Sequence, residues 1–223
     1  MADTGFARIY ETALLRHGET ALEERLPQPL PPAALAALPD DRLLSAMSLR
    51  IFRAGLRHGL VDAKWPAFEE AFAGFDPRTV AAYSDEHIEE LLGDRRLIRH
   101  LGKLRAVRAN ARAMLEITAR HGGFGKYLAA WPVTRIVDLW AEIARDFTQM
   151  GGRSAPYFLR MVGKDTFLLT SSVVKALDLF GVWRGEPRSR SDRQGVQAIF
   201  NGWAEETGRP LCQLSQILAM AVD

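Results

Sequence analysis

The spacing of apolar residues constrains this chain more than any other feature of its sequence. Apolar side chains recur every three or four positions along nearly the whole length, and runs that alternate apolar with polar residues are absent. This spacing places the apolar side chains on one face of an α-helix, whereas strands require alternation. We therefore predict an all-α protein, with helices over residues 5–17, 32–37, 40–57, 61–73, 77–82, 85–92, 96–120, 124–130, 133–147, 153–162, 171–180, 191–206 and 211–221.

Two helix starts are marked by capping residues. Ser84 precedes Asp85 and Glu86, so a hydroxyl acceptor and two acidic side chains meet the positive end of the next helix. Asp76 precedes Pro77, and proline suits the first helical position because an amide hydrogen there would have no helical partner.

The bulk composition excludes several classes of protein. With 223 residues and 48% hydrophobic content, the chain can bury a complete core. Its 29 Lys and Arg residues nearly balance 27 Asp and Glu, so the net charge of +2 does not by itself indicate a polyanionic partner. The single cysteine, Cys212, excludes a disulfide framework and a cysteine-built zinc site, so we predict no metal and no cofactor.

The N-terminal part of the sequence sets the predicted domain boundary. No run of about 18 or more apolar residues occurs, and the opening MADTGFARIY lacks the basic-then-apolar order of a secretory signal. We therefore predict a cytoplasmic protein with no membrane partner, and we expect a monomer. The stretch PQPLPP is stiff and predicts an extended connector. An N-terminal helix and Pro-rich connector, residues 1–31, thus precede the main domain, residues 32–223.

A strip of positive charge lies between residues 95 and 126, where nine cations face a single acid, Glu116. Arg105, Arg108 and Arg112 fall at spacings of three and four, on one flank of the predicted helix. Two interpretations stay open: a solvated helix surface, or a surface that attracts DNA with Lys103 and Arg105 as contacts. This basic strip comprises Arg95, Arg96, Arg99, Lys103, Arg105, Arg108, Arg112, Arg120 and Lys126.

A glycine-containing turn carries the clearest functional signal. The sequence TQMGGRSAPYFLRMV, from Thr148 to Val162, follows one predicted helix and resumes a helical pattern. A tight turn leaves amide groups at the start of the second helix, where the helix dipole also favours an anion, so a DNA phosphate can bind without any base being read. Alternatively, the glycine pair only ends the first helix. The predicted DNA contacts of this segment are Met150, Gly151, Gly152, Arg153, Ser154 and Lys164.

The same segment resembles the hairpin of the helix-hairpin-helix DNA glycosylase superfamily, through Gly151, Ser154, Ala155, Tyr157 and Phe158. A second stretch resembles the 3-methyladenine DNA glycosylase I family more specifically, and the resemblance extends over roughly residues 40–182. The shared features are Phe75-Asp76-Pro77, Ile98-Arg99-His100, Gly102-Lys103, Asn110-Ala111-Arg112 and, upstream, Ala54-Gly55-Leu56.

This resemblance implies an all-α, helix-hairpin-helix DNA glycosylase-like bundle of two lobes. It also implies a monofunctional DNA repair glycosylase of base-excision repair, which hydrolyses the N-glycosidic bond of alkylated purines such as 3-methyladenine. The implied partner is double-stranded DNA with a damaged base. Two further interpretations stay open: a non-catalytic DNA-binding protein of the same fold that has lost the pocket carboxylate, and a helical interaction domain that binds no DNA.

The chain also departs from the family's pattern. The family carries a zinc site of Cys and His near its termini, which a chain with one cysteine lacks. When aligned through Ala54-Gly55-Leu56, the family's base-recognising glutamate falls on Arg50 and its pocket tryptophan falls on His58. The broader superfamily places a catalytic aspartate at the start of the helix after the hairpin loop, where this chain reads LTSSV at residues 169–173.

Candidate site residues follow from position and residue type. The catalytic candidates are Asp165, Ser171 and His58, although Asp165 also suits a loop-capping role. Aromatic faces can stack on an extruded base, but aromatic residues at helical spacing usually pack in a core. Arg50 would repel a cationic base unless an acid such as Asp62 neutralised it. Other roles stay open for Arg50: binding phosphate, stacking on the base, or a buried ion pair. We expect the base pocket to be formed by Arg50, Phe52, Arg53, His58 and Trp65.

Overall fold

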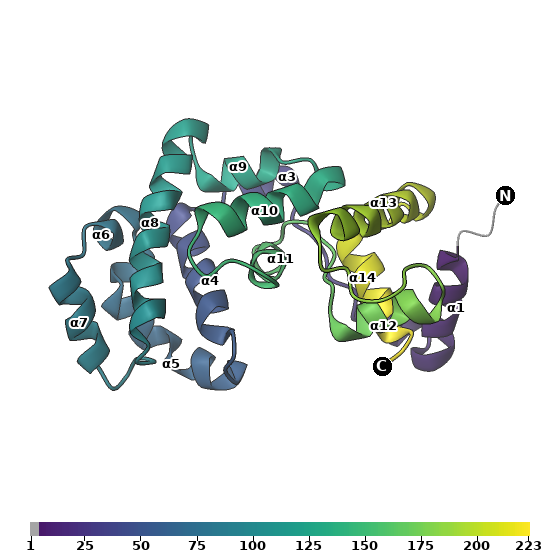
Figure 1. The fold of residues 1–223 in the computed structure, drawn as a ribbon, viewed down its shortest axis with the longest axis horizontal. Helices are drawn as coiled ribbons and strands as arrows, with labels where there is room; N and C mark the ends of the chain where they lie inside the picture. Colours follow the sequence, from purple (N-terminus) through teal and green to yellow (C-terminus); the bar gives the residue numbers. More distant parts are fainter. Residues whose placement is uncertain (1–4) are drawn as a thin grey trace. The chain divides into compact units, whose positions relative to one another are not determined.

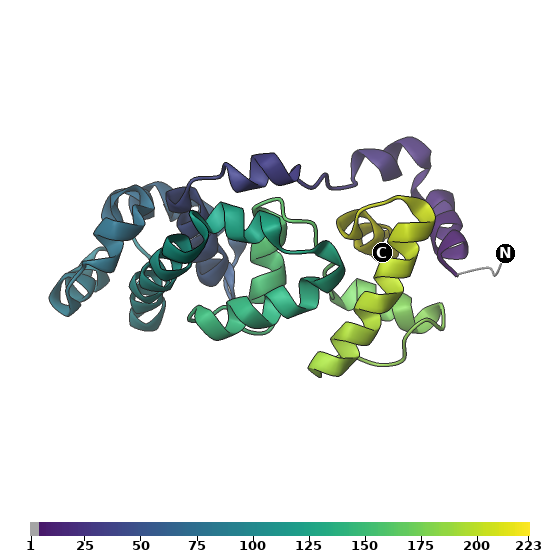
Figure 2. The same ribbon diagram turned by 90° about the horizontal axis from the view of Figure 1, so that it is seen from above.

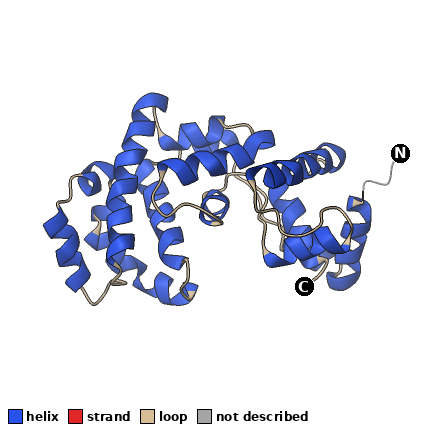
Figure 3. Cartoon of the chain, viewed as in Figure 1, coloured by secondary structure: helices blue, strands red, loops and turns tan. Residues whose placement is uncertain are grey.

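A computed structural model describes residues 5–223, and all regular structure in this range is helical (Figure 3). The prediction of an all-α protein is confirmed. The chain divides into two compact units. The hairpin unit, as we call it, contains Pro31–Trp131 and Leu139–Lys164, and the terminal unit contains the chain up to Leu30, Pro132–Asp138 and Asp165–Asp223. The predicted domains, residues 1–31 and 32–223, stay a prediction, because the terminal unit combines segments from both; residues 1–4 lie outside the described residues.

The hairpin unit contains α3 (Pro32–Ala36), α4 (Asp40–Arg53), α5 (His58–Ala71), the 3₁₀ turn η1 (Ala73–Phe75), α6 (Pro77–Ala81), α7 (Asp85–Gly93), α8 (Leu101–His121), α9 (Phe124–Ala130) and α11 (Ser154–Met161). The terminal unit contains α1 (Phe6–His17), α2 (Glu19–Glu24), the 3₁₀ turn η2 (Val133–Arg135), α12 (Ser171–Leu179), α13 (Arg190–Thr207) and α14 (Leu211–Met220). Helix α10 (Ile136–Asp146) contributes to both. Every predicted helix has a counterpart, and α2 is an additional one.

Helix α4 ends at Arg53, four residues before its predicted end. Gly55 takes a left-handed conformation with φ of 77°, through which a helix does not continue. The ammonium group of Lys103, on α8, donates hydrogen bonds to the carbonyl oxygens of Ala54 at 2.8 Å and Phe52 at 3.4 Å. These carbonyls lack helical partners because they lie at a helix end. The chain therefore turns here towards α5.

Helix α8 begins at Leu101, five residues after its predicted start. The ammonium group of Lys64, on α5, binds the carbonyl oxygens of Arg95 at 3.0 Å and Arg96 at 2.8 Å. These residues are thereby tied to α5 instead of joining α8. The His100 side chain then accepts a hydrogen bond from an amide of the first turn and caps the helix.

The two predicted caps are confirmed. The Ser84 hydroxyl accepts the His87 amide at 3.1 Å at the start of α7. The Asp76 carboxylate accepts the Thr79 amide at 2.8 Å, and Pro77 occupies the first position of α6. Hydrogen bonds from Thr79 lower the pKa of Asp76 below its ordinary value, because they favour the ionised carboxylate.

Helix α8 is the centre of the hairpin unit and packs against α4, α6, α7 and α9 (Figures 1 and 2). Beside it, α4, α5 and η1 enclose a cluster of aromatic rings. The Trp65 ring stacks on Phe68 and Phe75, with centroids 4.9 and 5.4 Å apart, and such pairs add to the free energy of burial. This aromatic cluster consists of Phe52, Trp65, Phe68, Phe72 and Phe75.

Helices from the two ends of the chain lie side by side in the terminal unit. Helix α1, purple in Figure 1, packs against α14, which is yellow. His17 Nε2 lies 2.9 Å from the carbonyl oxygen of Met220. The Sγ atom of the buried Cys212 lies 3.5 Å from the carbonyl oxygen of Pro27. The Pro-rich connector is thus held by the C-terminal helix.

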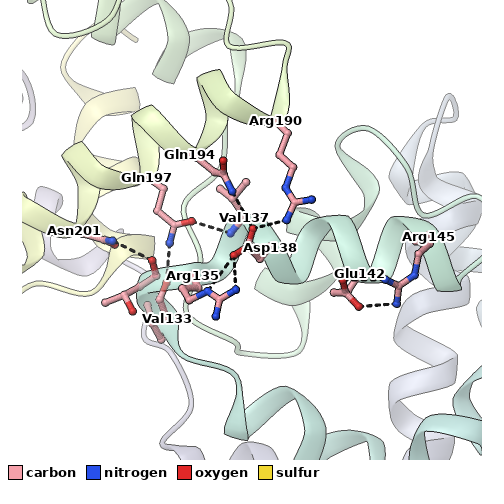
Figure 4. Close-up of polar contacts among 11 residues, drawn as sticks. Val133, Arg135, Val137, Asp138, Glu142, Arg145, Arg190, Gln194, Gln197 and Asn201 are labelled. Carbon is pink, nitrogen blue, oxygen red and sulfur yellow. Dashed lines mark hydrogen bonds and ion pairs between the residues drawn. The ribbon is translucent and has the colours of Figure 1, made fainter.

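A polar network attaches α13 to the segment that leads into α10 (Figure 4). Gln197 donates to the carbonyl oxygen of Val133 at 3.2 Å and accepts the amide of Val137 at 2.9 Å. Asp138 accepts hydrogen bonds from the side chains of Arg190, Arg135 and Gln194. The hydrogen bond from Arg190 is the largest of the effects that lower the pKa of Asp138.

One buried side chain holds the turn that follows α10. Asn110, on α8, is 0% exposed. Its Oδ1 accepts the Thr148 amide at 2.7 Å, and its Nδ2 donates to the Thr148 carbonyl oxygen at 3.1 Å. The side chain therefore pairs both backbone groups of Thr148 where the helix ends. This double hydrogen bond fixes the start of the turn on α8.

We expect Asn110→Ala to destabilise the protein, because both backbone groups of Thr148 lose their partner. A buried polar group left unpaired costs roughly 1–3 kcal/mol, so the free energy of unfolding should fall by about 2 kcal/mol or more. Urea denaturation followed by circular dichroism measures the change. The matched control is Asn201→Ala, which removes one hydrogen bond to the Thr134 carbonyl oxygen. An equal loss in the two variants would contradict the role assigned to Asn110.

Candidate functional site

A concave pocket of about 480 Å³ lies in the hairpin unit, where α4 ends and α11 begins. Its wall is formed by the last turn of α4, the turn to α5 and the first turn of α11. We call it the arginine pocket. Its lining residues are Arg50, Arg53, Ala54, Gly55, Leu56, Arg57, His58, Arg153 and Tyr157.

Cationic side chains dominate the arginine pocket. Four arginines line it, and its lining includes no carboxylate. The nearby Asp62 pairs with Arg53, at 2.8 Å between Nη2 and Oδ1. Asp62 is the acid that the sequence suggested as a partner of Arg50, so it neutralises a different arginine. The pocket therefore carries an excess of positive charge and is suited to an anionic group.

Arg50 is held in the pocket wall by an aromatic ring. Its guanidinium carbon lies 4.7 Å from the centroid of the Tyr157 ring, a cation–π arrangement. The Arg50 Nε atom is buried and has no hydrogen-bond partner among the described residues. Burial lowers the pKa of Arg50, the nearby Tyr157 opposes this effect, and the positive charge of Arg53 adds to it.

The turn between α10 and α11 presents two glycine amides beside this pocket. Gln149 and Gly152 take left-handed conformations, with φ of 62° and 61°, so the chain reverses sharply. The Ser154 amide closes the turn by donating to the Gly151 carbonyl oxygen at 3.1 Å. The amides of Gly151 and Gly152 find no acceptor within residues 5–223, and both glycines are exposed. Residues 148–153, which we call the hairpin, can therefore bind an anion through backbone donors.

Helix α11 adds few donors to the hairpin. Pro156 has no amide hydrogen, and the Ser154 side chain is buried and does not cap the helix. The prediction of Ser154 as a phosphate contact is therefore wrong for its side chain. A Cβ atom added at Gly151 would meet nothing within 4 Å, so a ligand can approach the backbone closely at this residue.

Three other predicted DNA contacts are buried, and those predictions are wrong. The Lys103 ammonium caps α4, and its pKa is lowered by burial and, to a smaller extent, by Arg50. The ammonium group of Lys164, which is 5% exposed, donates to the carbonyl oxygen of Trp131. Met150 packs in the core. Gly151, Gly152 and Arg153 are exposed, as a contact to DNA requires.

Three of the nine cations of the basic strip pair with carboxylates that lie outside it in the sequence. Arg105 lies 3.6 Å from a carboxylate oxygen of Glu89, on α7, so this predicted DNA contact faces an acid. Arg112 binds the carbonyl oxygen of Ala81 at 2.9 Å. The other ion pairs of the strip join Arg96 to Asp94 and Glu70, and Arg108 to Asp85. The charge of the strip is therefore neutralised only in part.

Two predicted base-pocket residues lie in the aromatic cluster. Phe52 is fully buried in the aromatic cluster. The Trp65 indole N–H donates to Ser45 Oγ at 3.1 Å, and its ring is stacked within the same cluster. Neither residue lines the arginine pocket, and their part in a base pocket stays a prediction. Arg50, Arg53 and His58 do line it.

The three catalytic candidates occupy different environments. Asp165 caps α14, because its two carboxylate oxygens accept the amides of Leu211 at 3.0 Å and Cys212 at 2.8 Å. Its capping role, one of the two that the sequence left open, is therefore confirmed. Ser171 is the exposed first residue of α12. His58 is the exposed first residue of α5 and lines the arginine pocket.

Sequence reasoning missed Arg57 and Tyr157 as pocket residues. The signal for Arg57 was present, because Gly55 ends α4 and places the following residues in a turn. The sequence offers Tyr157 in the hairpin pattern and among several aromatic faces for an extruded base, but not in the predicted base pocket. Its contact with Arg50 joins positions 107 residues apart (157 − 50), which helical spacing cannot indicate.

The described residues do not provide the metal site of the resembled family. Among residues 5–223, no group of three or more His, Cys, Asp or Glu side chains is arranged to hold a metal ion. Cys212 is buried in α14. The zinc site therefore does not fit this chain. The same residues contain no helix that is long and apolar enough to cross a membrane.

Comparisons with known proteins agree with this fold. A DNA-3-methyladenine glycosylase 1 of Escherichia coli (strain K12) is 38% identical over 78 residues, which are 35% of this chain and 42% of that protein. The chain thus matches less than half the length of this relative. The 3-methyladenine DNA glycosylase I of Staphylococcus aureus has a similar structure, with a TM-score of 0.52, 23% identity and coverage of 68% of this chain and 92% of the other.

A second similar structure covers both units. It is an 8-oxoguanine glycosylase/lyase of Methanocaldococcus jannaschii in complex with DNA, with a TM-score of 0.52, 14% identity and coverage of 95% of this chain and 94% of the other. At these identities the two structures establish the fold alone. The sequence profile of the methyladenine glycosylases matches residues 35–151, which is more than half of the chain and includes the wall of the arginine pocket from Arg50 to His58. The chain therefore belongs to the methyladenine glycosylase family.

Proposed function

We propose that this protein is a monofunctional DNA repair glycosylase that hydrolyses the N-glycosidic bond of alkylated purines such as 3-methyladenine. The observation that carries the proposal is the family match over residues 35–151. We further propose that it acts as a cytoplasmic monomer on double-stranded DNA with a damaged base, and that it uses no cofactor.

The hairpin supports DNA as the substrate. The unpaired amides of Gly151 and Gly152 offer two donors to a phosphate oxygen, in a turn that the Asn110 side chain holds on α8. A contact of this kind binds any sequence, because it reads the backbone and no base. An enzyme that searches duplex DNA for rare lesions needs such a contact.

The chemistry asks little of the protein's side chains. Extruding a nucleotide costs a few kcal/mol, and this cost is lowest for a damaged base. An N-alkylated purine is already positively charged, so its glycosidic bond to the sugar carbon C1′ breaks readily. The base keeps the electron pair of this bond and leaves as a neutral molecule. Water then bonds to C1′ and loses a proton. His58, exposed at the pocket rim, is our candidate for contact with that water or proton.

The charge of the arginine pocket favours a second candidate function, a non-catalytic DNA-binding protein of the same fold. Two like charges about 4 Å apart repel by about 4 kcal/mol at an effective dielectric constant near 20. A cationic purine placed against Arg50 would meet this repulsion, because Asp62 pairs with Arg53. In this candidate, the hairpin binds DNA and no base is released.

Base release from methylated duplex DNA distinguishes the two functions. With the protein in excess, we expect free 3-methyladenine, identified by mass spectrometry, and none from an unmethylated duplex of the same sequence. The alkylated base leaves as a neutral molecule, so its departure needs little acid catalysis. Retained DNA binding without any released base would instead establish the non-catalytic function.

We expect Gly151→Val to weaken binding to every duplex by about tenfold, because its side chain would keep a phosphate from the hairpin amides and cost about one charge-assisted hydrogen bond. Fluorescence anisotropy at low salt, with damaged and undamaged duplexes, measures this loss. Gly202→Val is the matched control, since a Cβ atom there also projects into open space, on α13. If Gly151→Val bound DNA with unchanged affinity, the hairpin would have no part in DNA binding.

A further inference from the structure

Two of the four arginines that line the arginine pocket have no acidic partner among the described residues. Arg57 is exposed in the turn between α4 and α5 and forms no ion pair among the described residues. Arg50 likewise has no carboxylate partner there, and its Nε atom is buried without an acceptor. Of the pocket's arginines, Arg53 is balanced by Asp62. Unpaired buried donors are rare in folded proteins, so the place beside Arg50 suits an added acceptor.

The cations of this region also oppose one another. The charge of Arg53 contributes to lowering the pKa of Arg50, and the charge of Arg50 contributes to lowering the pKa of Lys103, after burial in both cases. Lys103 has a structural task, since it caps α4, but Arg50 caps nothing. An arrangement of like charges that costs stability is typical of a binding site.

The geometry suits an oxyanion, and the DNA binding proposed above makes a phosphate the oxyanion at hand. A guanidinium group is planar and presents a fork of donors that matches two oxygens of a phosphate. The Tyr157 ring lies against the Arg50 guanidinium at 4.7 Å, which orients that fork before any ligand binds. Arg57 and Arg153 approach from the turn and from α11, so three arginines from separate segments surround one space.

We propose that the arginine pocket binds a phosphodiester group of the DNA strand, beside the phosphate that the hairpin binds. Arg153 connects the two sites, because it ends the hairpin and lines the pocket. The inference rests on the DNA binding put forward under the proposed function. It places Arg50 on the backbone of the strand, at the position where the resembled family has a base-recognising carboxylate. The damaged base then occupies another place on the protein.

The salt dependence of binding to an undamaged duplex tests this assignment. The logarithm of the binding constant falls linearly with the logarithm of the salt concentration, and each phosphate contact adds about 0.9 to the magnitude of this slope. We expect Arg50→Met and Arg57→Met each to lower the slope by about that amount and to weaken binding. Arg78→Met, an exposed arginine of α6 outside the pocket, is the matched control and should leave the slope unchanged. An unchanged slope in both pocket variants would overturn the proposal.

Thermal unfolding of the free protein separates binding from a structural role. Removing Arg50 relieves the repulsion and the unpaired Nε, so Arg50→Met should unfold at a higher temperature than the wild type while binding DNA more weakly. A lower unfolding temperature with an unchanged slope would make Arg50 a packing residue and overturn the proposal. Arg57→Met keeps the test valid if the first variant folds poorly, because Arg57 is exposed.

Inorganic phosphate distinguishes the strand from a free phosphate-bearing ligand. At constant ionic strength, phosphate should raise the unfolding temperature of the wild type more than chloride does, and this difference should vanish in Arg50→Met. If it vanishes while the salt slope for DNA stays unchanged, the site takes a free ligand and the strand assignment fails. Base release is measured in parallel. A lower slope without released base would support the phosphate site and contradict the glycosylase activity. Released base with an unchanged slope would support the activity and contradict the phosphate site.

Discussion

The wall of the arginine pocket depends on one buried ammonium group. Lys103 donates to the carbonyl oxygens of Ala54 and Phe52, at the end of α4 where helix geometry supplies no partners. A cation at this end also interacts favourably with the helix dipole. The contact ends α4, fixes the turn to α5 on α8 and so positions Arg57 and His58. The residue that sequence reasoning assigned to DNA instead shapes the site from within.

The same contact explains the electrostatic character of the site. A buried Lys103 next to Arg50 and Arg53 places three cations close together, and burial makes their repulsion less screened than it would be at the surface. Asp62 offsets part of it through Arg53. The remainder is available to an anion, whose binding would pair Arg50 and reduce the repulsion together. Lys103 is needed to end the helix, so the fold itself brings positive charge to this place.

The sequence predicts the helices well because their signals are local. Spacings of three and four and the caps at Asp76 and Ser84 depend on neighbours within one or two turns. The site was predicted less completely, because its charges are decided by contacts between segments. Arg105 lies on α8 and Glu89 on the neighbouring α7, and nothing near Arg105 in the sequence indicates that the two side chains meet. Likewise, the stacking of Trp65 in the aromatic cluster, which removes it from the pocket, depends on how α5 meets η1.

Family membership and pocket chemistry therefore bear on different parts of the function. Membership concerns the scaffold that presents a hairpin beside a turn, and it extends over residues 35–151. The chemistry of the pocket is decided by single side chains, and an arginine in place of a carboxylate reverses the sign of the charge that the pocket attracts. An arginine fork on a phosphate cannot distinguish one base from another. Selectivity for a lesion must then arise from the lower cost of extruding a damaged nucleotide or from groups outside this pocket. If Arg50 binds the strand as proposed, the contact with DNA is kept while the means of choosing a base differs.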